Sequence, residues 1–513
     1  MDEKLKWFFV LILLASTLAG TYFRLEIYDA TYINGWITRD IDRAFNLVDG
    51  NYFPLAGSEA NNGGRLPGPF LYLIYAIALL IDYSYESIFT LNLVLNLISV
   101  IILYASLRKF FDFNFSALTT AFLCINLTHI GSVGFPINPA FMFPVIAIYI
   151  WVLLEFTLNK NFKALPFAFV IVSLGIQMHF SLVTFYVVPL AIVALFRFKI
   201  PKKIILISVA TTLTCFIPYF IFLHQNLRVK FTQPYVFFFG PDFWSFSGWV
   251  KLFLVENTIN RMTFLNGIRW AQDFESNIAA LYYALTLAGI VLLGVRVFVA
   301  WRGNGLKEIK KETFLFSIFY VPAFLYELTQ PMAGTGNPHN WYTFIFIMPQ
   351  SMVLSYLFLF LLDKFKSAGG KGVTLLSILI LFLYLGQNTL KDVKSSASDY
   401  KKNLTSGEYK NLKLFFNVLI DKLHFTPKIY KENVYMEGLF GNVPPRSSKL
   451  FELIYAESQG RSPESKKEGG SRNCYYLVDR RSKLLKKGGI ENHRFDTFLN
   501  DKEIKIKHTF ELS

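Results

Sequence analysis

Apolar runs long enough to cross a membrane dominate this chain. Eleven occur, around 7–23, 88–107, 115–130, 139–157, 164–178, 180–197, 203–223, 277–300, 313–328, 341–362 and 373–390. About 20 apolar residues in a helix span the roughly 30 Å of hydrocarbon in a bilayer. Because a backbone surrounded by lipid must satisfy its own hydrogen bonds, such runs form helices. The sequence therefore predicts a polytopic α-helical membrane protein with about 11 transmembrane helices.

The distribution of charge divides the chain in two. Only 17% of the 513 residues are charged, against about 25% in average soluble domains. Residues 391–513 hold 40 charged residues and residues 1–390 hold 47. We therefore predict a transmembrane catalytic domain over 1–390 and a soluble domain over 391–513. A helical start near 408–423 and β-rich runs at Asn433–Met436 and Cys474–Val478 predict that the second is a small α/β domain.

The basic residues predict how the chain is oriented. If the short apolar run 68–82 does not cross, 18 of the 27 basic residues in 1–390 fall on one side, which the positive-inside rule assigns to the cytoplasm. Two long loops, 24–87 and 224–276, then lie outside together with the soluble domain. The Lys- and Phe-rich composition fits a bacterial inner (cell) membrane, with the active site facing the periplasm or outside. Since the basic clusters set topology, the net charge of +15 predicts membrane lipids and no nucleic acid as partners.

The first outer loop contains a predicted juxtamembrane helix with two carboxylates. Thr38 is suited to be its N-cap, Gly50 its left-handed stop, and Asp40 and Asp42 then fall in the first turn. One interpretation is that Asp40 stabilises the helix dipole and forms a surface pair with Arg39 or Arg43. The functional interpretation is that one of the two carboxylates accepts a proton at the membrane surface.

The same loop continues into a second candidate group. A glycine turn at Gly63 and Gly64 is followed by Arg65 and an aromatic half-helix that includes Tyr72. The forked donors of an arginine suit a lipid-linked phosphate. The competing interpretation is an interfacial side chain that extends to lipid headgroups.

Short matches to a known superfamily are spread over about residues 1–350. They are Trp36–Asp40, Phe53–Gly57, Gly64–Tyr72, the pair Asn138-Pro139 and Gln177-x-His179. This pattern resembles the C-type glycosyltransferase superfamily, and within it the bacterial branch related to protein O-mannosyltransferases and the lipid A aminoarabinose transferase. The chain departs from that pattern where many members have an Asp-Glu pair and Lys-Pro-Pro, since it has Arg39-Asp40-Ile-Asp42 and Arg65-Leu-Pro67.

The resemblance implies a function and roles for particular residues. Its members move a sugar from a polyprenyl-phosphate carrier to an acceptor outside the membrane, here a glycan, a lipid or a protein. Carried over, Asp40 is the catalytic base, Asp42 is the second candidate, and Arg65 binds the donor phosphate. We therefore expect an integral membrane glycosyltransferase of inverting type.

Further polar residues fall at predicted outer ends of the spans. His179, His339 and Arg269 are candidates for binding the donor phosphate, and Arg261 lies in the same outer loop as Arg269. A histidine near the interface is otherwise a helix-end residue with satisfied hydrogen bonds. The histidine spacing matches no metal motif, although an Asp-x-Asp such as Asp40/Asp42 is able to hold a divalent cation.

Two other classes of protein stay open. A flippase or transporter of lipid-linked glycans predicts ionisable residues in mid-membrane and repeated halves, which the sequence does not show. An O-antigen ligase or polymerase-like enzyme also uses a polyprenyl-linked donor, but predicts its essential arginine in a late outer loop.

Overall fold

The fold is described from a computed structural model over residues 3–28, 35–50, 52–58, 65–83, 85–134, 136–225, 276–303, 305–329, 344–365, 368–406, 434–437, 474–478 and 505–509. These residues form two compact units. The first comprises Met1–Asp29, Leu55–Leu71 and Phe89–Ser396, and the second Ala30–Pro54, Tyr72–Ile88 and Ala397–Ser513.

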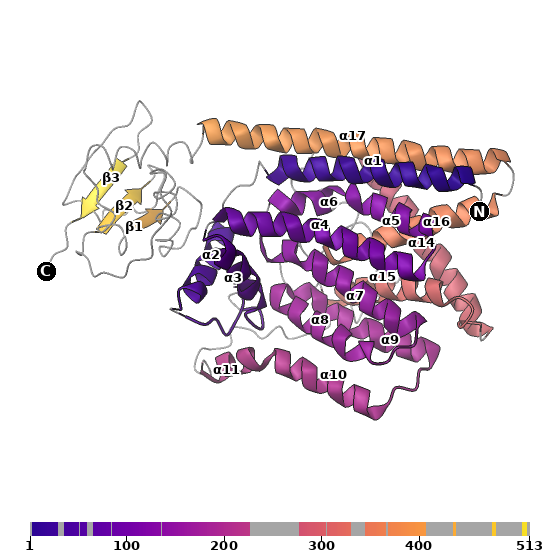
Figure 1. Ribbon diagram of the computed structural model, residues 1–513, viewed down its shortest axis with the longest axis horizontal. Helices are drawn as coiled ribbons and strands as arrows, with labels where there is room; N and C mark the ends of the chain where they lie inside the picture. Colours follow the sequence, from indigo (N-terminus) through magenta and orange to yellow (C-terminus); the bar gives the residue numbers. More distant parts are fainter. Residues whose placement is uncertain are drawn as a thin grey trace. The chain divides into compact units, whose positions relative to one another are not determined.

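Helices make up the first unit (Figure 1). The longest are α1 (Glu3–Tyr28), α4 (Tyr85–Phe110), α14 (Ser276–Arg302) and α17 (Ala368–Ser406). The others are α5 (Phe113–Cys124), α6 (Leu127–Gly131), α7 (Met142–Leu158), α8 (Ala164–Met178), α9 (Val187–Phe196), α10 (Lys202–Cys215), α11 (Ile217–Gln225), α15 (Lys310–Thr329) and α16 (Ile347–Lys364), with short 3-10 helices η1 (Ser132–Gly134), η2 (Asn138–Phe141) and η3 (Phe180–Tyr186).

Each of the eleven predicted apolar runs corresponds to a helix or a helix pair. Among the described residues, six helices are long and apolar enough to cross a membrane, and two bent pairs, α5 with α6–η1 and α10 with α11, raise the number to eight. The helix α3 (Phe70–Ile81) has 12 residues and is about 18 Å long, short of the bilayer core. Its shortness is what we expect of the run at 68–82 if that run does not cross.

Two aromatic-rich clusters fill the first unit. The larger joins α7, α8, α9, α15 and α16, and includes Phe143 stacked on Phe344 with ring centroids 5.4 Å apart. The smaller joins α1, α5, α16 and α17 around Phe122, whose ring stacks on Phe382 at 4.6 Å. The helices α1 and α17 therefore share one apolar core although they lie far apart in the sequence.

Arg24 lies inside α1, which corrects its assignment to the first outer loop. Its side chain is 1% exposed, because α1 continues to Tyr28 rather than ending near residue 23. Its Nε donates to Asn96 Oδ1 at 2.7 Å, and its Nη1 donates to the carbonyl oxygens of Gly20 at 2.7 Å and Cys124 at 2.9 Å. Its Nη2 contacts His129 Nδ1 at 2.5 Å. The guanidinium thus links α1 to α4 and to the bend between α5 and α6.

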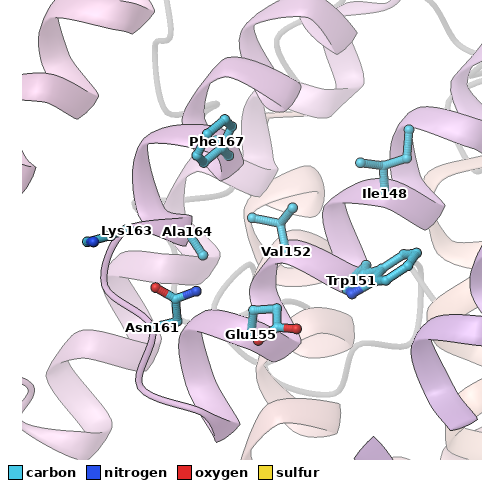
Figure 2. Close-up of a pocket in the computed structure, with 8 residues that line it drawn as sticks. All are labelled: Ile148, Trp151, Val152, Glu155, Asn161, Lys163, Ala164 and Phe167. Atoms are coloured by element: carbon cyan, nitrogen blue, oxygen red, sulfur yellow. The ribbon is translucent and has the colours of Figure 1, made fainter. Parts of the chain in front are cut away.

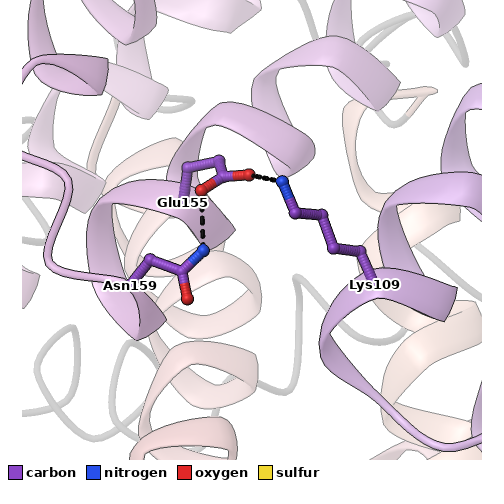
Figure 3. Close-up of polar contacts among 3 residues, drawn as sticks. All are labelled: Lys109, Glu155 and Asn159. Carbon is purple, nitrogen blue, oxygen red and sulfur yellow. Dashed lines mark hydrogen bonds and ion pairs between the residues drawn. The ribbon is translucent and has the colours of Figure 1, made fainter.

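A shallow apolar groove lies where α7 ends and α8 begins. It has a volume of about 290 Å³ and is lined by Ile148, Trp151, Val152, Glu155, Asn161, Lys163, Ala164 and Phe167 (Figure 2). At its polar end Lys109 of α4 pairs with Glu155, which also accepts a hydrogen bond from Asn159 at 2.8 Å (Figure 3). The pair ties α4 to α7 at this end of the groove.

The second unit contains α2 (Gly35–Val48), most of α3 and a three-stranded sheet. Strand β1 (Val434–Glu437) runs parallel to β2 (Cys474–Val478), which runs antiparallel to β3 (Lys505–Thr509). The strands β1 and β2 coincide with the two β-rich runs found in the sequence. The predicted helix at 408–423 lies outside the described residues.

The start of α2 differs from its prediction. The helix begins at Gly35, so the prediction of Thr38 as N-cap is wrong, and Asp40 and Asp42 lie in the second turn. The predicted stop is confirmed, since Gly50, two residues after the end of the helix at Val48, has φ +69°. The interaction of a carboxylate with the helix dipole is confined to the first turn. It therefore explains the presence of Asp40 less well than the sequence suggested.

The contact between α1 and α5 leads to a prediction about Gly20. An added Cβ at Gly20 would lie 2.2 Å from the carbonyl oxygen of Cys124, whereas one at Gly386 of α17 would meet nothing within 4 Å. We expect Gly20→Ala to force α1 away from α5 and to lower stability by about 1–3 kcal/mol. Gly386→Ala, the matched control, should leave stability unchanged or slightly raised. Thermal unfolding of both variants in detergent is the measurement, and equal midpoints would contradict this account of the helix contact.

Candidate active site

Asp40 is the buried end of a hydrogen-bonded chain between α2 and α3. Its side chain is 3% exposed, and Oδ1 accepts a hydrogen bond from the Tyr72 hydroxyl at 3.2 Å. The same hydroxyl accepts from Nη1 of Arg43 at 2.8 Å, and the guanidinium of Arg43 lies 5.9 Å from the centre of the Tyr72 ring. The chain therefore runs in one direction, from the cation through the phenol to the carboxylate.

The sequence of α2 explains why these groups meet. Asp40 and Arg43 are three residues apart and so lie on one face of the helix. A second tyrosine contact lies further along, where Tyr83 donates to Asp49 Oδ1 at 2.7 Å and its ring meets Phe45 edge-on at 4.7 Å. Two phenol–carboxylate contacts thus hold α2 against α3 and the residues that follow it.

This arrangement suits proton transfer. The Tyr72 hydroxyl accepts from Arg43 and directs its own proton at Oδ1 of Asp40. This hydrogen bond fixes one oxygen of the side chain, so the carboxyl group is held in one orientation, as a general base needs to be. The side chain of Asp42 lies outside the described residues.

Arg65 lies in the first unit, in a turn where Leu66 pairs through its backbone with Gly57 and Ser58. Leu66 accepts a backbone hydrogen bond from Gly57 at 2.8 Å and donates one to Ser58 at 3.0 Å. The guanidinium lies 5.9 Å from the centre of the Phe222 ring of α11. A guanidinium over an aromatic face is attracted by the ring, and its forked N–H donors suit bidentate contact with a phosphate.

The residues of the Asn-Pro and Gln-x-His matches meet in the first unit. Asn138 Nδ2 donates to the carbonyl oxygen of Met178 at 2.7 Å, between Gln177 and His179. Gln177 bonds to the start of α3 and to the end of α10, through Phe70 N at 3.2 Å and the carbonyl oxygen of Cys215 at 2.7 Å. The two sequence matches are thus parts of one packed structure.

His179 serves as a helix cap. Its Nδ1 accepts from the backbone N–H of Ser181 at 3.3 Å and lies 2.8 Å from the Ser181 hydroxyl, at the start of η3. Burial lowers its pKa to about 4. The imidazole is therefore neutral at physiological pH, and any contact it makes with a phosphate is a hydrogen bond from Nε2–H rather than an ion pair.

The other residues predicted for the site, His339, Arg269 and Arg261, lie outside the described residues. Within the part of the chain that is described, no group of three or more His, Cys, Asp or Glu side chains is arranged to hold a metal ion.

Two residues near Asp40 were not predicted as site residues. Tyr72 was noted only as part of the aromatic half-helix, and Arg43 only as a surface partner of Asp40. The available signal was the shared helix face of Asp40 and Arg43, but the sequence gives no means of knowing that a phenol lies between them.

The groove between α7 and α8 is not part of this region. Lys163 and Ala164, which line it, lie at the first turn of α8, whereas Gln177 lies in the last. That separation is about 20 Å along the helix.

Comparisons with known proteins find a family model and solved structures that this chain resembles. The family model described as dolichyl-phosphate-mannose-protein mannosyltransferase matches residues 67–222. Among solved structures, ArnT from Cupriavidus metallidurans bound to undecaprenyl phosphate matches with a TM-score of 0.52 and 10% identity, covering 97% of each chain. No curated protein matches the chain.

An oligosaccharyltransferase from Archaeoglobus fulgidus in its apo form aligns with a TM-score of 0.49 and 11% identity, over 87% of this chain and 64% of that one. The family model and the fold shared with ArnT confirm the resemblance to the C-type glycosyltransferase superfamily. Residues 67–222 thus match a family of glycosyltransferases, and the chain shares the fold of ArnT.

The burial of His179 leads to a prediction about pH. Its pKa is about 4 in the folded protein and about 6.5 in an unfolded chain. Between these pH values only the unfolded chain binds the proton. The contribution of His179 to the free energy of unfolding is therefore fully present above about pH 6.5 and is lost as the pH falls toward 4. His179→Asn keeps a capping side chain and removes the titration. From pH 7 to 5 we expect the wild type to lose about 2 kcal/mol more than the variant in unfolding measurements, and an equal loss would show that His179 titrates normally.

Proposed function

We propose that this protein transfers a sugar, with inversion, from a polyprenyl-phosphate carrier to an extracytoplasmic glycan, lipid or protein. The acceptor's hydroxyl or amine attacks the anomeric carbon and gives its proton to Asp40. The bond from that carbon to the phosphate oxygen breaks, and the polyprenyl phosphate leaves against Arg65. The observation that carries the proposal is the directed chain from Arg43 through Tyr72 to the buried Asp40.

The choice of Asp40 as the base rests on its own burial and its hydrogen bond to Tyr72. A carboxylate that is 3% exposed and bonded to a phenol is separated from bulk water, which strengthens its interaction with a reacting proton. Asp42 stays the second candidate for the base.

The donor phosphate is assigned to Arg65. Its guanidinium is weakly hydrated and lies 5.9 Å from the centre of the Phe222 ring, and its forked donors suit a phosphate. In this proposal His179 contributes a neutral hydrogen bond, and Arg269 and His339 are further phosphate ligands. The donor class is also supported by the undecaprenyl phosphate bound to ArnT.

The proposed topology has eleven crossings, a cytoplasmic N-terminus and an active site on the periplasmic or outer face of a bacterial inner membrane. The α/β domain over 391–513 lies on the same side, where it helps to select the acceptor. The three strands β1 to β3 support an ordered sheet in this part of the chain.

A substitution at Asp40 tests the base. Asp40→Asn keeps an oxygen that accepts from Tyr72, so the protein should fold, but it cannot take up a proton from the acceptor. We expect turnover to fall by about 10²–10⁴-fold. The assay is sugar transfer from labelled polyprenyl-phosphate hexose and pentose donors in membranes that contain each variant.

Asp49→Asn is the matched control, because Asp49 also accepts from a tyrosine but has no proposed role in the reaction. Its turnover should stay close to that of the wild type. Full activity with neutral residues at both 40 and 42 would rule out the proposed mechanism.

A substitution at Arg65 tests the phosphate site. Arg65→Ala should raise the KM for the donor and weaken binding of undecaprenyl phosphate, with about 1.5–3 kcal/mol of binding energy lost. Arg65→Lys keeps the charge without the fork and should recover part of that loss. Unchanged carrier binding in Arg65→Ala would place the phosphate elsewhere.

The same variants separate the competing functions. Dependence on Arg261 or Arg269 with indifference to Asp40 would favour an O-antigen ligase or polymerase-like reaction. Carrier translocation without sugar transfer would favour a flippase.

A further inference from the structure

Gln177 is buried at a point where three segments of the first unit meet. Its side chain is 2% exposed. Oε1 accepts from the backbone N–H of Phe70, and Nε2 donates to the carbonyl oxygen of Cys215. One carboxamide thus joins the end of the Arg65 segment to the junction of α10 and α11.

The junction at Cys215 requires a donor of this kind. Cys215 is the last residue of α10, and α11 begins at Ile217 with a bend of 47° between the two helices. The last carbonyl groups of a helix have no partner within it, and lipid supplies none. Gln177 provides the missing N–H, so the bend is held by a residue of α8.

The Arg65 segment lies directly on the same carboxamide. Gly68 has φ +129°, and an added Cβ there would be 2.3 Å from Oε1 of Gln177. At Gly57, which pairs with Leu66, an added Cβ would be 2.7 Å from the carbonyl oxygen of Gly68 and 3.2 Å from that of Gln177. Only residues without a side chain fit at these two positions.

The turn that carries Arg65 and the helix that carries Phe222 are therefore both linked to the Gln177 side chain. The turn that carries it packs on Gln177 through Gly57 and Gly68, and Phe222, over which its guanidinium lies, belongs to α11. We propose that Gln177 is a positioning residue, which sets the place of the Arg65 guanidinium relative to Phe222 and so the affinity for the phosphate of the lipid carrier. This inference rests on the proposed role of Arg65 in binding that phosphate.

Two substitutions remove the hydrogen bonds of Gln177 in different ways. Gln177→Met keeps the volume and removes both hydrogen bonds. Gln177→Glu keeps an acceptor for Phe70 but places a carboxylate against the carbonyl oxygen of Cys215. If Arg65 depends on the position of Phe222 in α11, both variants should weaken phosphate binding.

Gln350 provides a matched control in the same unit. It is 1% exposed in α16, and its Nε2 donates to Thr286 Oγ1 at 3.1 Å. Gln350→Met removes a buried carboxamide that has no connection with Arg65. It should lower the unfolding midpoint about as much as Gln177→Met does, but leave the KM for the donor unchanged.

The experiment measures binding of undecaprenyl phosphate and the split between KM and kcat in the full-length protein. We expect Gln177→Met to weaken carrier binding and raise the donor KM by about ten- to a hundredfold, with a smaller change in kcat. Combined with Arg65→Ala it should add little, because both variants remove the same interaction. Gly68→Ala, which keeps the glutamine but forces its side chain and the turn apart, should give the same pattern and replaces Gln177→Met if that variant does not fold.

Each result decides between the two claims. If Arg65→Ala weakens carrier binding and neither Gln177→Met nor Gly68→Ala does, the positioning role is wrong and the role of Arg65 stands. Additive effects of Gln177→Met and Arg65→Ala would also overturn the positioning role. If Arg65→Ala leaves carrier binding unchanged, the proposed phosphate site fails, and the role of Gln177 fails with it.

Discussion

A helix that bends within a membrane exposes carbonyl groups that lipid cannot satisfy, and this constraint organises the first unit. Two spans bend, by 53° between α5 and α6 and by 47° between α10 and α11. At each bend a side chain from another helix donates to the last carbonyl oxygen, Arg24 to Cys124 and Gln177 to Cys215. Such bends are tolerated where protein groups replace the lost backbone partners. The donors therefore tie helices together at the places where a lipid-exposed backbone would be least stable.

The two donor side chains, Arg24 and Gln177, differ in charge. Arg24 carries a charge into a buried site, and its described partners are the carbonyl oxygens of Gly20 and Cys124, an amide oxygen and an imidazole. A buried charge of this kind is stable only while its donors stay bonded, so it fixes one arrangement of α1, α4 and α5. Gln177 is neutral and has one donor and one acceptor in use, and so it joins segments with a smaller desolvation cost.

The sequence predicts the spans, the stop at Gly50 and the two strand positions, because these depend on local composition and on backbone conformation. It does not predict Arg24, Tyr72 or Gln177 as structural centres. Arg24 lies at the edge of an apolar run, and only packing shows that three other segments offer it acceptors. Tyr72 looks like any aromatic residue of a half-helix until α2 packs beside it with Asp40 and Arg43. The prediction of Thr38 as N-cap failed for a different reason, since the helix begins three residues earlier, at Gly35.

The proposed reaction places opposite demands on its two charged groups, and the structure supports each demand with different chemistry. A base must be held in place while buried, and Asp40 accepts a hydrogen bond from a phenol that in turn accepts one from a guanidinium. A phosphate ligand must hold its positive charge where the substrate binds. The guanidinium of Arg65 lies 5.9 Å from the centre of the Phe222 ring, and an aromatic face attracts a cation without neutralising it. Since the ring and the turn are both linked to Gln177, the proposed phosphate site depends on a side chain that never needs to touch the substrate.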